Sequence, residues 1–384
     1  MTGGMDAPAG ARFAAASATG ADWRTTAKAC LDKLGHVGGC NLGFLYISDE
    51  LAADAVSIVT LMRGVTGIKD WVGTVGIGIC ATGEELFGKP AIAVMAAQFE
   101  PGSFHLPAPI TESIEGFAPE TAEWLKGHGP VLALVHGDPR NPQTHDIIPE
   151  LSDALGGFLV GGLTSSRTNY GQFGGRPGTA PVIEGGVSGV LFSSEVPVAT
   201  GLTQGCTPIG PVHKITRAQN NIIVEIDGRP ALEVFKEDIG ELLARDLRRV
   251  AGYIFAALPI TGSDTGDYLV RNLVGIDPNH GLIAIGDMVE PGRTIMFARR
   301  DLASAQADLE RMLSVIQKRL KGPPRGGVYV SCLARGPALF GDDSQELKTI
   351  RDTLGDFPLV GFFANGEISH NRLYGYTGVL TLFL

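Results

Sequence analysis

The hydrophobic positions between residues 41 and 99 follow a fixed order of local patterns. An apolar run over residues 41–47 predicts a strand. Apolar residues then recur at helical spacing, and we expect Gly64 to end this helix. Apolar runs over 72–80 and 91–99 predict two adjacent strands, with a Gly-containing turn between them. The segment is therefore a strand–helix–strand–turn–strand unit.

The same order returns twice further along the chain, which indicates an internal repeat. The segments of the second copy are 131–135, 147–155, a weaker turn at 161–165, and 187–192. Those of the third copy are 327–332, 345–354 and the final stretch 361–384. The first and third copies share the turn pattern G-x-x-A-x-G-E, at Gly78–Glu84 and Gly361–Glu367.

Helices are also predicted outside the repeats. Residues 22–38 contain one that Asp22 caps and Gly35 ends. A second begins after Pro230, and the most regular one covers 301–320. The glycine-rich loop 165–186 between two segments of the second copy is either a lid or an ornament, and we favour the ornament.

Length and composition extend this picture to the whole chain. A chain of 384 residues exceeds the ~250–300 residues at which single cores stop growing, so two domains are expected. Hydrophobic residues make up 44% and charged residues 19%, which suits strands covered on both faces. We predict an α/β fold of the α+β type, with two related domains whose mixed β-sheets are flanked by helices. The expected division is a flexible tail over 1–22 and domains over 23–215 and 216–384.

Charge, apolar runs and cysteine content bear on possible partners and on the location of the protein. The net charge is −10 and no basic stripe is visible, so nucleic acid is not an expected partner. No apolar run reaches the ~18 residues of a membrane span, and residues 1–22 lack the apolar core of a signal peptide. Five scattered cysteines without a C-x-x-C pair indicate a reducing, cytoplasmic location.

The two A-x-G-E turns are the first candidate site. Glycine after a strand lets the backbone approach a ligand, and the adjacent glutamate can hold a cation. If the two halves are pseudo-symmetric, Glu84 and Glu367 are equivalent and frame one cleft. The alternative, that both turns are only solvated structure, has about equal weight. The residues expected to line the cleft from these turns are Thr82, Gly83, Glu84, Asn365, Gly366 and Glu367.

The segment from Cys332 to Gly336 is the second candidate. Arg335 stands at a strand end and could hold a ligand carboxylate with two hydrogen bonds. Glu84 or Glu367 would then hold an ammonium group. Cys332 beside an arginine could be a reactive nucleophile, but a buried cysteine that closes a core strand is the favoured interpretation. Cys332, Arg335 and Gly336 complete the expected lining.

Two clusters that contain histidine are weaker candidates for a functional site. His136 and Asp138 are followed by His145 and Asp146, and Cys30, His36 and Cys40 lie close in sequence. Neither set supplies four ligands at a spacing typical of zinc sites, so no metal is expected.

With these residues in view, the chain resembles the FIST family, named for F-box and intracellular signal transduction proteins. The first half resembles the FIST N domain and the second half the FIST C domain, over nearly everything after residue 25. The matching segments are 73–86, 157–162, 288–292, 330–336, 361–368 and 375–378.

The resemblance implies a sensory module that binds small ligands, amino acids among them. Family members are joined to, or encoded near, kinases and other signalling output domains. No such domain is visible here, so the signal would pass to a separate protein such as a histidine kinase. Some members bind haem and sense nitric oxide, but no motif selects an axial ligand among the eight histidines. Others adjoin an F-box, for which residues 1–22 leave no room.

We therefore expect a cytoplasmic protein that binds a small ligand, without a cofactor, in a cleft between the repeated units. An enzyme is less favoured than a binding protein. The alternatives are a haem-containing nitric-oxide sensor, an enzyme that uses Cys332 as nucleophile, and an interaction scaffold without a ligand.

Overall fold

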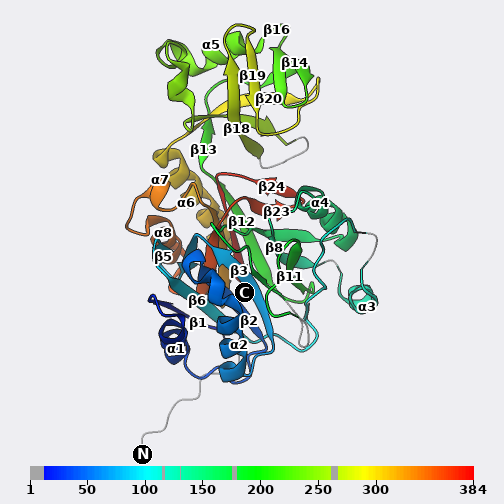
Figure 1. The fold of residues 1–384 in the computed structure, drawn as a ribbon, viewed down its shortest axis with the longest axis vertical. Helices are drawn as coiled ribbons and strands as arrows, with labels where there is room; N and C mark the ends of the chain where they lie inside the picture. Colours follow the sequence, from blue (N-terminus) through cyan, green and yellow to red (C-terminus); the bar gives the residue numbers. More distant parts are fainter. Residues whose placement is uncertain (1–12, 115–116, 130, 175–179, 261–266) are drawn as a thin grey trace, which may run out of the picture. The chain divides into compact units, whose positions relative to one another are not determined.

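The computed structural model describes residues 13–114, 117–129, 131–174, 180–260 and 267–384. The chain divides into two compact units (Figure 1). The first contains residues up to 202 together with 311–373 and 378–384, and the second contains 203–310 and 374–377. These units do not follow the expected division at 215, because the last repeat belongs to the same unit as the first two. The fold combines helices with several mixed sheets, as predicted.

The first unit is built from three copies of the predicted repeat in its described part. Repeat 1 contains β2 (Leu42–Ser48), η1 (Asp49–Asp54), α2 (Ala55–Thr66), β3 (Asp70–Gly76), β4 (Gly78–Ala81), β5 (Glu84–Phe87) and β6 (Ala91–Ala97). Repeat 2 contains β8 (Leu132–Gly137), α4 (Thr144–Leu155), β9 (Phe158–Leu163), β10 (Gln172–Phe173) and β11 (Val187–Phe192). Repeat 3 contains β21 (Gly326–Cys332), α7 (Pro337–Phe340), α8 (Gln345–Leu354), β22 (Leu359–Ala364), β23 (Glu367–His370), β24 (Arg372–Tyr374) and β25 (Thr377–Phe383).

Each repeat forms the centre of its own sheet. The first two long strands are parallel, and the last strand of the repeat runs antiparallel to the first on its other side. A further strand extends each sheet beyond this last strand. These outer strands are β1 (Phe13–Thr19), β7 (Phe104–His105) and β12 (Val198–Gln204). Residues 13–19, which we assigned to a flexible tail, are therefore part of a sheet, and the rest of that tail up to residue 12 lies outside the described residues.

The open edge of each sheet is closed by a strand from a different repeat. The β4–β5 hairpin of repeat 1 pairs with β22 of repeat 3, and β23 of repeat 3 pairs with β9 of repeat 2. Strand β10 of repeat 2 pairs with β3 of repeat 1. The exchange is therefore cyclic: each of the three sheets contains a strand that another repeat contributes. In this sense the three sheets are interlocked. The single strand that we predicted over 72–80 is two strands in two different sheets, separated at Ile77.

Glycine marks the equivalent position in the second strand of every repeat. A Cβ on Gly73, Gly161 or Gly361 would lie within 2 Å of the backbone carbonyl oxygen of the adjacent first strand. The register pairs these glycines with Leu45, Val135 and Tyr329, respectively.

This register corrects our alignment of the shared turn motif. Gly361 corresponds to Gly73 and not to Gly78, which lies in β4 and belongs to the exchanged hairpin. Glu84 and Glu367 are consequently not equivalent positions. The G-x-x-A-x-G-E likeness is a coincidence of two segments with different roles in their repeats.

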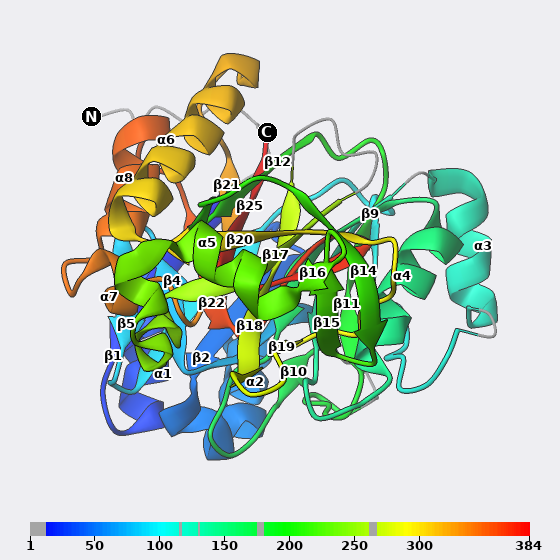
Figure 2. The same cartoon turned by 90° about the horizontal axis from the view of Figure 1, so that it is seen from above.

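The faces of the three sheets share one core, and helices cover their other faces. The shared core contains side chains from all three repeats, among them Tyr46, Val160 and Phe362. The helices α1 (Trp23–Leu34) and α2 cover sheet 1, and α4 covers sheet 2. Figure 2 shows α6 (Leu302–Arg319) beside α8, where Gln317 Nε2 donates a 2.8 Å hydrogen bond to the carbonyl oxygen of Thr353. The remaining helix of this unit is α3 (Pro119–His128).

The predicted helix ends agree with the structure where a capping residue is present. Asp22 caps α1 through a hydrogen bond from Thr25 N, and Gly35 follows its last residue. Gly64, by contrast, lies inside α2, which ends before Gly67 in the left-handed conformation.

The second unit is an antiparallel barrel. Its strands are β13 (Cys206–Pro208), β14 (His213–Gln219), β15 (Ile222–Ile226), β16 (Arg229–Pro230), β17 (Ile254–Pro259), β18 (Tyr268–Asp277), β19 (Leu282–Ile285) and β20 (Thr294–Arg300). Pairing of β17 with β20 closes the ring that runs through β14, β15, β19 and β18. Helix α5 (Ala231–Ala244) packs Phe235 against Phe297 at a ring distance of 4.7 Å, and η2 (Leu247–Val250) follows it.

We predict that Gly361→Ala lowers the free energy of unfolding by about 3 kcal/mol or more, because a methyl group has no room beside the Tyr329 carbonyl. Gly64→Ala is the matched control in the same unit: Gly64 is exposed within α2 with open space at its Cβ. That substitution should raise stability by about 0.5–1 kcal/mol. Denaturant unfolding measures both, and equal effects of the two substitutions would contradict the assigned strand approach.

Candidate functional site

The carboxyl ends of the first and second strands of each repeat form a polar face on the first unit. We call it the carboxyl-end face and define it by residues 48–49, 76–77, 137–141, 163–167, 332–336 and 364–367. Ser165 joins all three repeats there: its Oγ accepts a hydrogen bond from Ile77 N at 2.9 Å and donates one to the carbonyl oxygen of Phe363 at 2.5 Å. Ligands of open α/β sheets commonly bind at the carboxyl ends of strands, which makes this face the candidate site.

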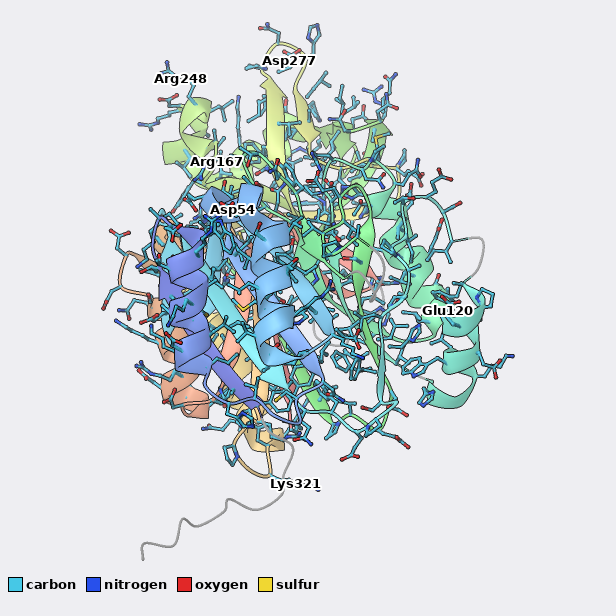
Figure 3. All side chains as sticks on the ribbon, turned by 60° about the horizontal axis from the view of Figure 1, so that its bottom comes forward. Asp54, Glu120, Arg167, Arg248, Asp277 and Lys321 are labelled. Carbon is cyan, nitrogen blue, oxygen red and sulfur yellow. The ribbon has the colours of Figure 1, made fainter. Side chains whose placement is uncertain are left out.

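Repeat 1 contributes Asp49, which follows β2 directly. Its carboxylate is almost fully buried and accepts hydrogen bonds from the backbone N and from Nη1 of Arg167, at 3.1 and 2.9 Å. Arg167 comes from repeat 2, and Glu50 lies 3.8 Å from its Nη1. The Arg167 side chain is labelled in Figure 3 and is 59% exposed, so part of its guanidinium is accessible.

Repeat 2 contributes Asp138, which follows β8. Its buried carboxylate accepts hydrogen bonds from Arg140 Nη2 at 2.7 Å and from Gly185 N at 2.9 Å. Burial alone would raise the pKa of Asp138, but the hydrogen bonds from Arg140 and Gly185 outweigh it and lower the pKa. Arg140 also contacts Glu184 at 2.6 Å and stacks on the ring of Tyr170 at 4.3 Å. The Arg140 side chain is 47% exposed.

Repeat 3 contributes a pair that is fully buried. Arg335 Nε donates a 2.7 Å hydrogen bond to Glu346 Oε1, and neither side chain is accessible to solvent. Glu346 also accepts hydrogen bonds from the hydroxyl groups of Tyr329 and Ser331, at 2.5 and 3.0 Å, and a longer one from Gly336 N. The carboxylate is therefore satisfied on all sides, as a buried charge requires.

A second buried carboxylate stands next to this pair. Glu85, on the exchanged strand β5, accepts hydrogen bonds at 3.2 and 3.5 Å from the backbone N of Glu346 and Leu347, at the first turn of α8. Its own backbone N donates to Ser344 Oγ at 2.9 Å. Burial and the nearby charge of Glu346 raise the pKa of Glu85 to about 7, although the two backbone N–H groups and Arg335 oppose this.

The nine residues that we predicted fall into two places. Thr82, Gly83 and Glu84 form the turn of the β4–β5 hairpin, which packs against repeat 3, where Cys332, Arg335 and Gly336 lie. Phe87 of this hairpin contacts Phe363 at a ring distance of 4.3 Å. The hairpin exchange thus brings these two sets into one region, with Arg335 and Gly336 buried and Glu84 exposed.

The third set lies at a different junction. Asn365, Gly366 and Glu367 connect β22 to β23, and there the backbone of Leu163 exchanges hydrogen bonds with Asn365 N and Gly366 O. Gly366 has φ of +135°, which favours glycine. Asn365 is exposed and Glu367 is buried.

Sequence reasoning missed the acidic partners of the site. The A-x-G-E pattern selects Glu84 and not its neighbour Glu85, and Glu346 lies in a segment for which the sequence predicts only a helix. The one available signal for Glu346 is an acidic residue in the first turn of α8. Asp49, Arg140 and Arg167 were likewise not selected, because their pairing depends on which loops the fold brings together.

The histidine and cysteine candidates do not form a metal centre in the described part of the chain, where no group of three or more His, Cys, Asp or Glu side chains is placed to hold a metal ion. His136 lies in the shared core with its Nε2 at 3.2 Å from the Tyr46 hydroxyl and its ring 5.7 Å from that of Phe362. Burial lowers the pKa of His136 to about 3, so the ring is neutral. Cys332 is 9% exposed, and burial raises the pKa of Cys30 to about 12.

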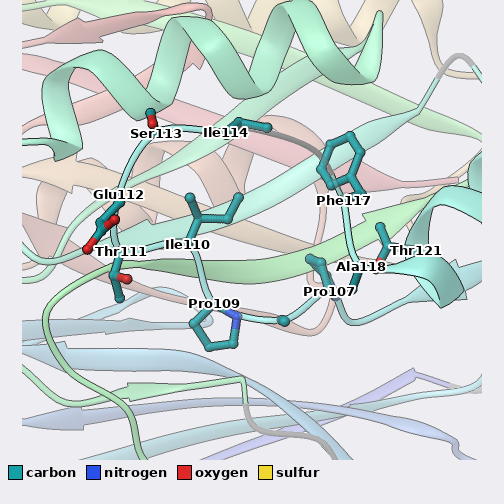
Figure 4. Close-up of a pocket in the computed structure, with 11 residues that line it drawn as sticks. Pro107, Pro109, Ile110, Thr111, Glu112, Ser113, Ile114, Phe117, Ala118 and Thr121 are labelled. Atoms are coloured by element: carbon teal, nitrogen blue, oxygen red, sulfur yellow. The ribbon is translucent and has the colours of Figure 1, made fainter.

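The described residues also form three surface pockets. Residues 107–114 together with Phe117, Ala118 and Thr121 line one of about 240 Å³ (Figure 4). A more open one is formed by the amino ends of β8 and β9 with His370, and an apolar one lies on the barrel between η2 and β18. None of the nine predicted residues lines these three pockets.

The barrel contains a separate charged cluster. His213 is bonded by both ring nitrogens, Nδ1 to Asp227 at 2.7 Å and Nε2 to Asp238 at 3.0 Å. Both nitrogens face carboxylates, so the ring is protonated when both contacts are hydrogen bonds. Burial disfavours that charge, but the hydrogen bonds that the ring donates to the two carboxylates outweigh it and raise the pKa of His213. The cluster ties α5, which carries Asp238, to the barrel.

These observations define a class of protein before any comparison: three interlocked α/β repeats with an acid–arginine pair at each first strand end, joined to a small barrel. The chain belongs to the FIST family. A FIST N domain matches residues 41–229 and a FIST C domain matches residues 231–370, which confirms the resemblance seen in the sequence. FIST domains are associated with sensory signal transduction.

Similar proteins are found in mycobacteria. An uncharacterized protein of Mycobacterium tuberculosis is 36% identical over 349 residues, which cover 86% of this chain and 88% of that protein. An uncharacterized protein of Mycobacterium bovis is 30% identical over 365 residues, 87% of each chain. No helix in the described residues is long and apolar enough to cross a membrane.

We predict that Glu346→Ala lowers the free energy of unfolding by about 3–5 kcal/mol, because it leaves the buried guanidinium of Arg335 without its counter-charge. Asp352→Ala is the control on the same helix, since its pair with Arg351 is exposed and should contribute less than about 1 kcal/mol. Urea unfolding of the two variants provides the comparison. A loss at Glu346 no larger than at Asp352 would show that the buried pair is not a stabilising contact.

We predict that α5 loosens as the pH rises above 6.5. The raised pKa of His213 means that its contribution is fully present below the unfolded value of about 6.5 and is lost as the pH passes the folded pKa. Hydrogen exchange of residues 231–238, corrected for intrinsic rates, should become several-fold faster between pH 6 and 8.5. His213→Gln should remove this change, whereas His280→Gln, at an exposed histidine–aspartate pair, should leave it intact. An unchanged pH profile in His213→Gln would refute the assignment.

Proposed function

We propose that the chain is a cytoplasmic sensory protein that binds a small ligand carrying both a carboxylate and an amine, such as an amino acid. Binding takes place on the carboxyl-end face, and the signal passes to a separate output protein such as a histidine kinase. Family membership supports the sensory role. The nature of the ligand follows from the charges of the face.

One observation carries this proposal. In the described residues, each first strand of the three repeats ends at an acid–arginine pair, and two of the three arginines are about half exposed. Arg167 bonds Asp49 through Nη1, and its Nε–Nη2 edge can bind a carboxylate with two hydrogen bonds. Arg140 uses Nε and Nη2 for Asp138 and Glu184 and can offer Nη1 to the same ligand. Glu50 and Glu184 stand beside them and can hold an ammonium group. The acid–arginine pairs also fix the arginine side chains before a ligand arrives, which reduces the entropic cost of binding.

In this proposal the ligand carboxylate binds Arg140 and Arg167 and not Arg335, which the sequence suggested for that role. That residue has no accessible surface, and the Glu346 carboxylate already occupies the position that a ligand carboxylate would take on it. A ligand would have to displace Glu346 and enter beneath the β4–β5 hairpin. The Nε–Nη2 edge of Arg167 and the Nη1 atom of Arg140 require neither step.

The test is a thermal-shift screen of the purified chain against amino acids and related small acids, followed by calorimetry of the hits. A ligand that binds the native state raises the melting temperature by mass action. Arg140→Ala and Arg167→Ala should each weaken binding of a hit by about tenfold or more, the loss expected for one charge-assisted contact.

Arg248→Ala is the control, because Arg248 is 92% exposed in the second unit and is not one of the residues that define this face. It should leave the affinity unchanged. Hits that bind all variants equally would refute the carboxyl-end face as the site. An absorption spectrum of the same sample tests the haem alternative, for which a Soret band is the expected sign.

A further inference from the structure

We propose that the outer strand of the β4–β5 hairpin is a proton-controlled latch that closes over the buried Arg335–Glu346 pair when Glu85 is protonated and loosens when Glu85 is charged. The latch is defined as residues 82–87 together with residues 344–347 of the first turn of α8. It is a property of the junction between repeats 1 and 3 and does not depend on the ligand site proposed above.

In strand β5, Glu85 makes the hydrogen bonds to the first turn of α8, whereas Leu86 and Phe87 pack against apolar neighbours. Among the residues that the structure describes, this strand is at the edge of its sheet and pairs only with β4. Glu85 Oε1 holds the backbone N of Glu346 and Leu347, and Ser344 Oγ accepts from Glu85 N. Glu85 Oε2 is buried and has no hydrogen-bond partner among the described residues. This unpartnered oxygen is the natural place for a proton.

The charge balance of the cluster points the same way. Two carboxylates, Glu85 and Glu346, face a single guanidinium, and Glu346 has the closer contact with it. With Glu85 charged, the buried cluster carries one uncompensated negative charge. With Glu85 protonated, the cluster is neutral, and the free-energy cost of burying it is lowest.

The other charged or titratable groups around Glu85 do not supply a second counter-charge. Cys80 on β4 and Tyr329 on β21 are buried, and burial raises the pKa of both above the ordinary values, so both are neutral. On α8, Lys348 is paired with Asp343 and Arg351 with Asp352. Glu84 is exposed on the turn side of the same strand, where its Oε2 is 3.4 Å from Ser17 Oγ.

The direction of the pH effect follows from the raised pKa of Glu85, about 7 in the closed state. An ordinary glutamate ionises near 4.3, so the open state loses its proton first as the pH rises. Closure is therefore fully favoured below about pH 4.3, weakens as the pH rises toward 7, and stays at its weakest above that value. The latch responds within the range around neutrality.

Hydrogen exchange of the full chain between pH 5 and 8, corrected for intrinsic rates, tests the proposal. Protection of residues 82–87 and 344–347 should fall by about tenfold or more from pH 5 to 7 and then level off. Residues 44–47 of β2 should show no such change, which separates local opening from global unfolding.

Glu85→Gln replaces the carboxyl group with a neutral group of the same size and should hold the latch closed, with flat protection over the whole range. Glu84→Gln is the matched control on the adjacent residue and should retain the wild-type profile. The proposal is overturned if wild-type protection of residues 82–87 is constant from pH 5 to 8, if residues 44–47 lose protection equally, or if Glu85→Gln keeps the wild-type fall. The wild-type profile decides alone if Glu85→Gln does not fold.

Discussion

The unpaired edge of a β-sheet is the constraint on which the first unit depends. Each repeat contributes three strands to the centre of its own sheet, and the backbone N–H and C=O groups on the outer side of its second strand need partners. Every repeat obtains them from a strand that belongs to another repeat, through β10, β4 and β23. Because the exchange is cyclic, no repeat can be removed without exposing an edge on one of the others. The interlocked sheets also explain why one core contains side chains from all three repeats.

Strand exchange also decides which charges are buried. Glu85 enters repeat 3 because its strand does, and there it meets the first turn of α8 and the buried pair of Arg335 and Glu346. The equivalent strand ends of repeats 1 and 2 keep their arginines at the surface. One structural motif has therefore produced two different sites: an exposed charged face suited to a ligand, and a sealed cluster suited to a structural or regulatory role.

The sequence was sufficient to predict the repeats and insufficient to predict their exchange. Hydrophobic periodicity identified all three units and most of their helices, since each of those signals is local. The apolar run over 72–80 gave no sign that Gly76 ends one strand and Gly78 begins another in a different sheet. A parallel strand and an exchanged hairpin strand are both buried and apolar, so composition does not distinguish them. The same ambiguity led us to align Gly78 with Gly361 and to select Glu84 where its neighbour Glu85 makes the buried contacts. The identity of Glu346 as the partner of Arg335 depends on how α8 folds back on β21, which is a tertiary contact with no local signature.

The order of the segments along the chain adds a consequence for folding. The barrel is inserted between repeats 2 and 3, so the sheet that receives β4–β5 is completed only by residues after 326. The FIST N match contains two repeats and the start of the barrel, and the FIST C match contains most of the barrel and most of repeat 3. Neither matched half holds a complete set of strand edges for the first unit. The pairing of β4 with β22 joins residues about 280 positions apart, and closing such a long loop costs conformational entropy before the contact stabilises the fold. The first unit therefore needs both matched segments, because each contains strand edges of that unit that the other pairs.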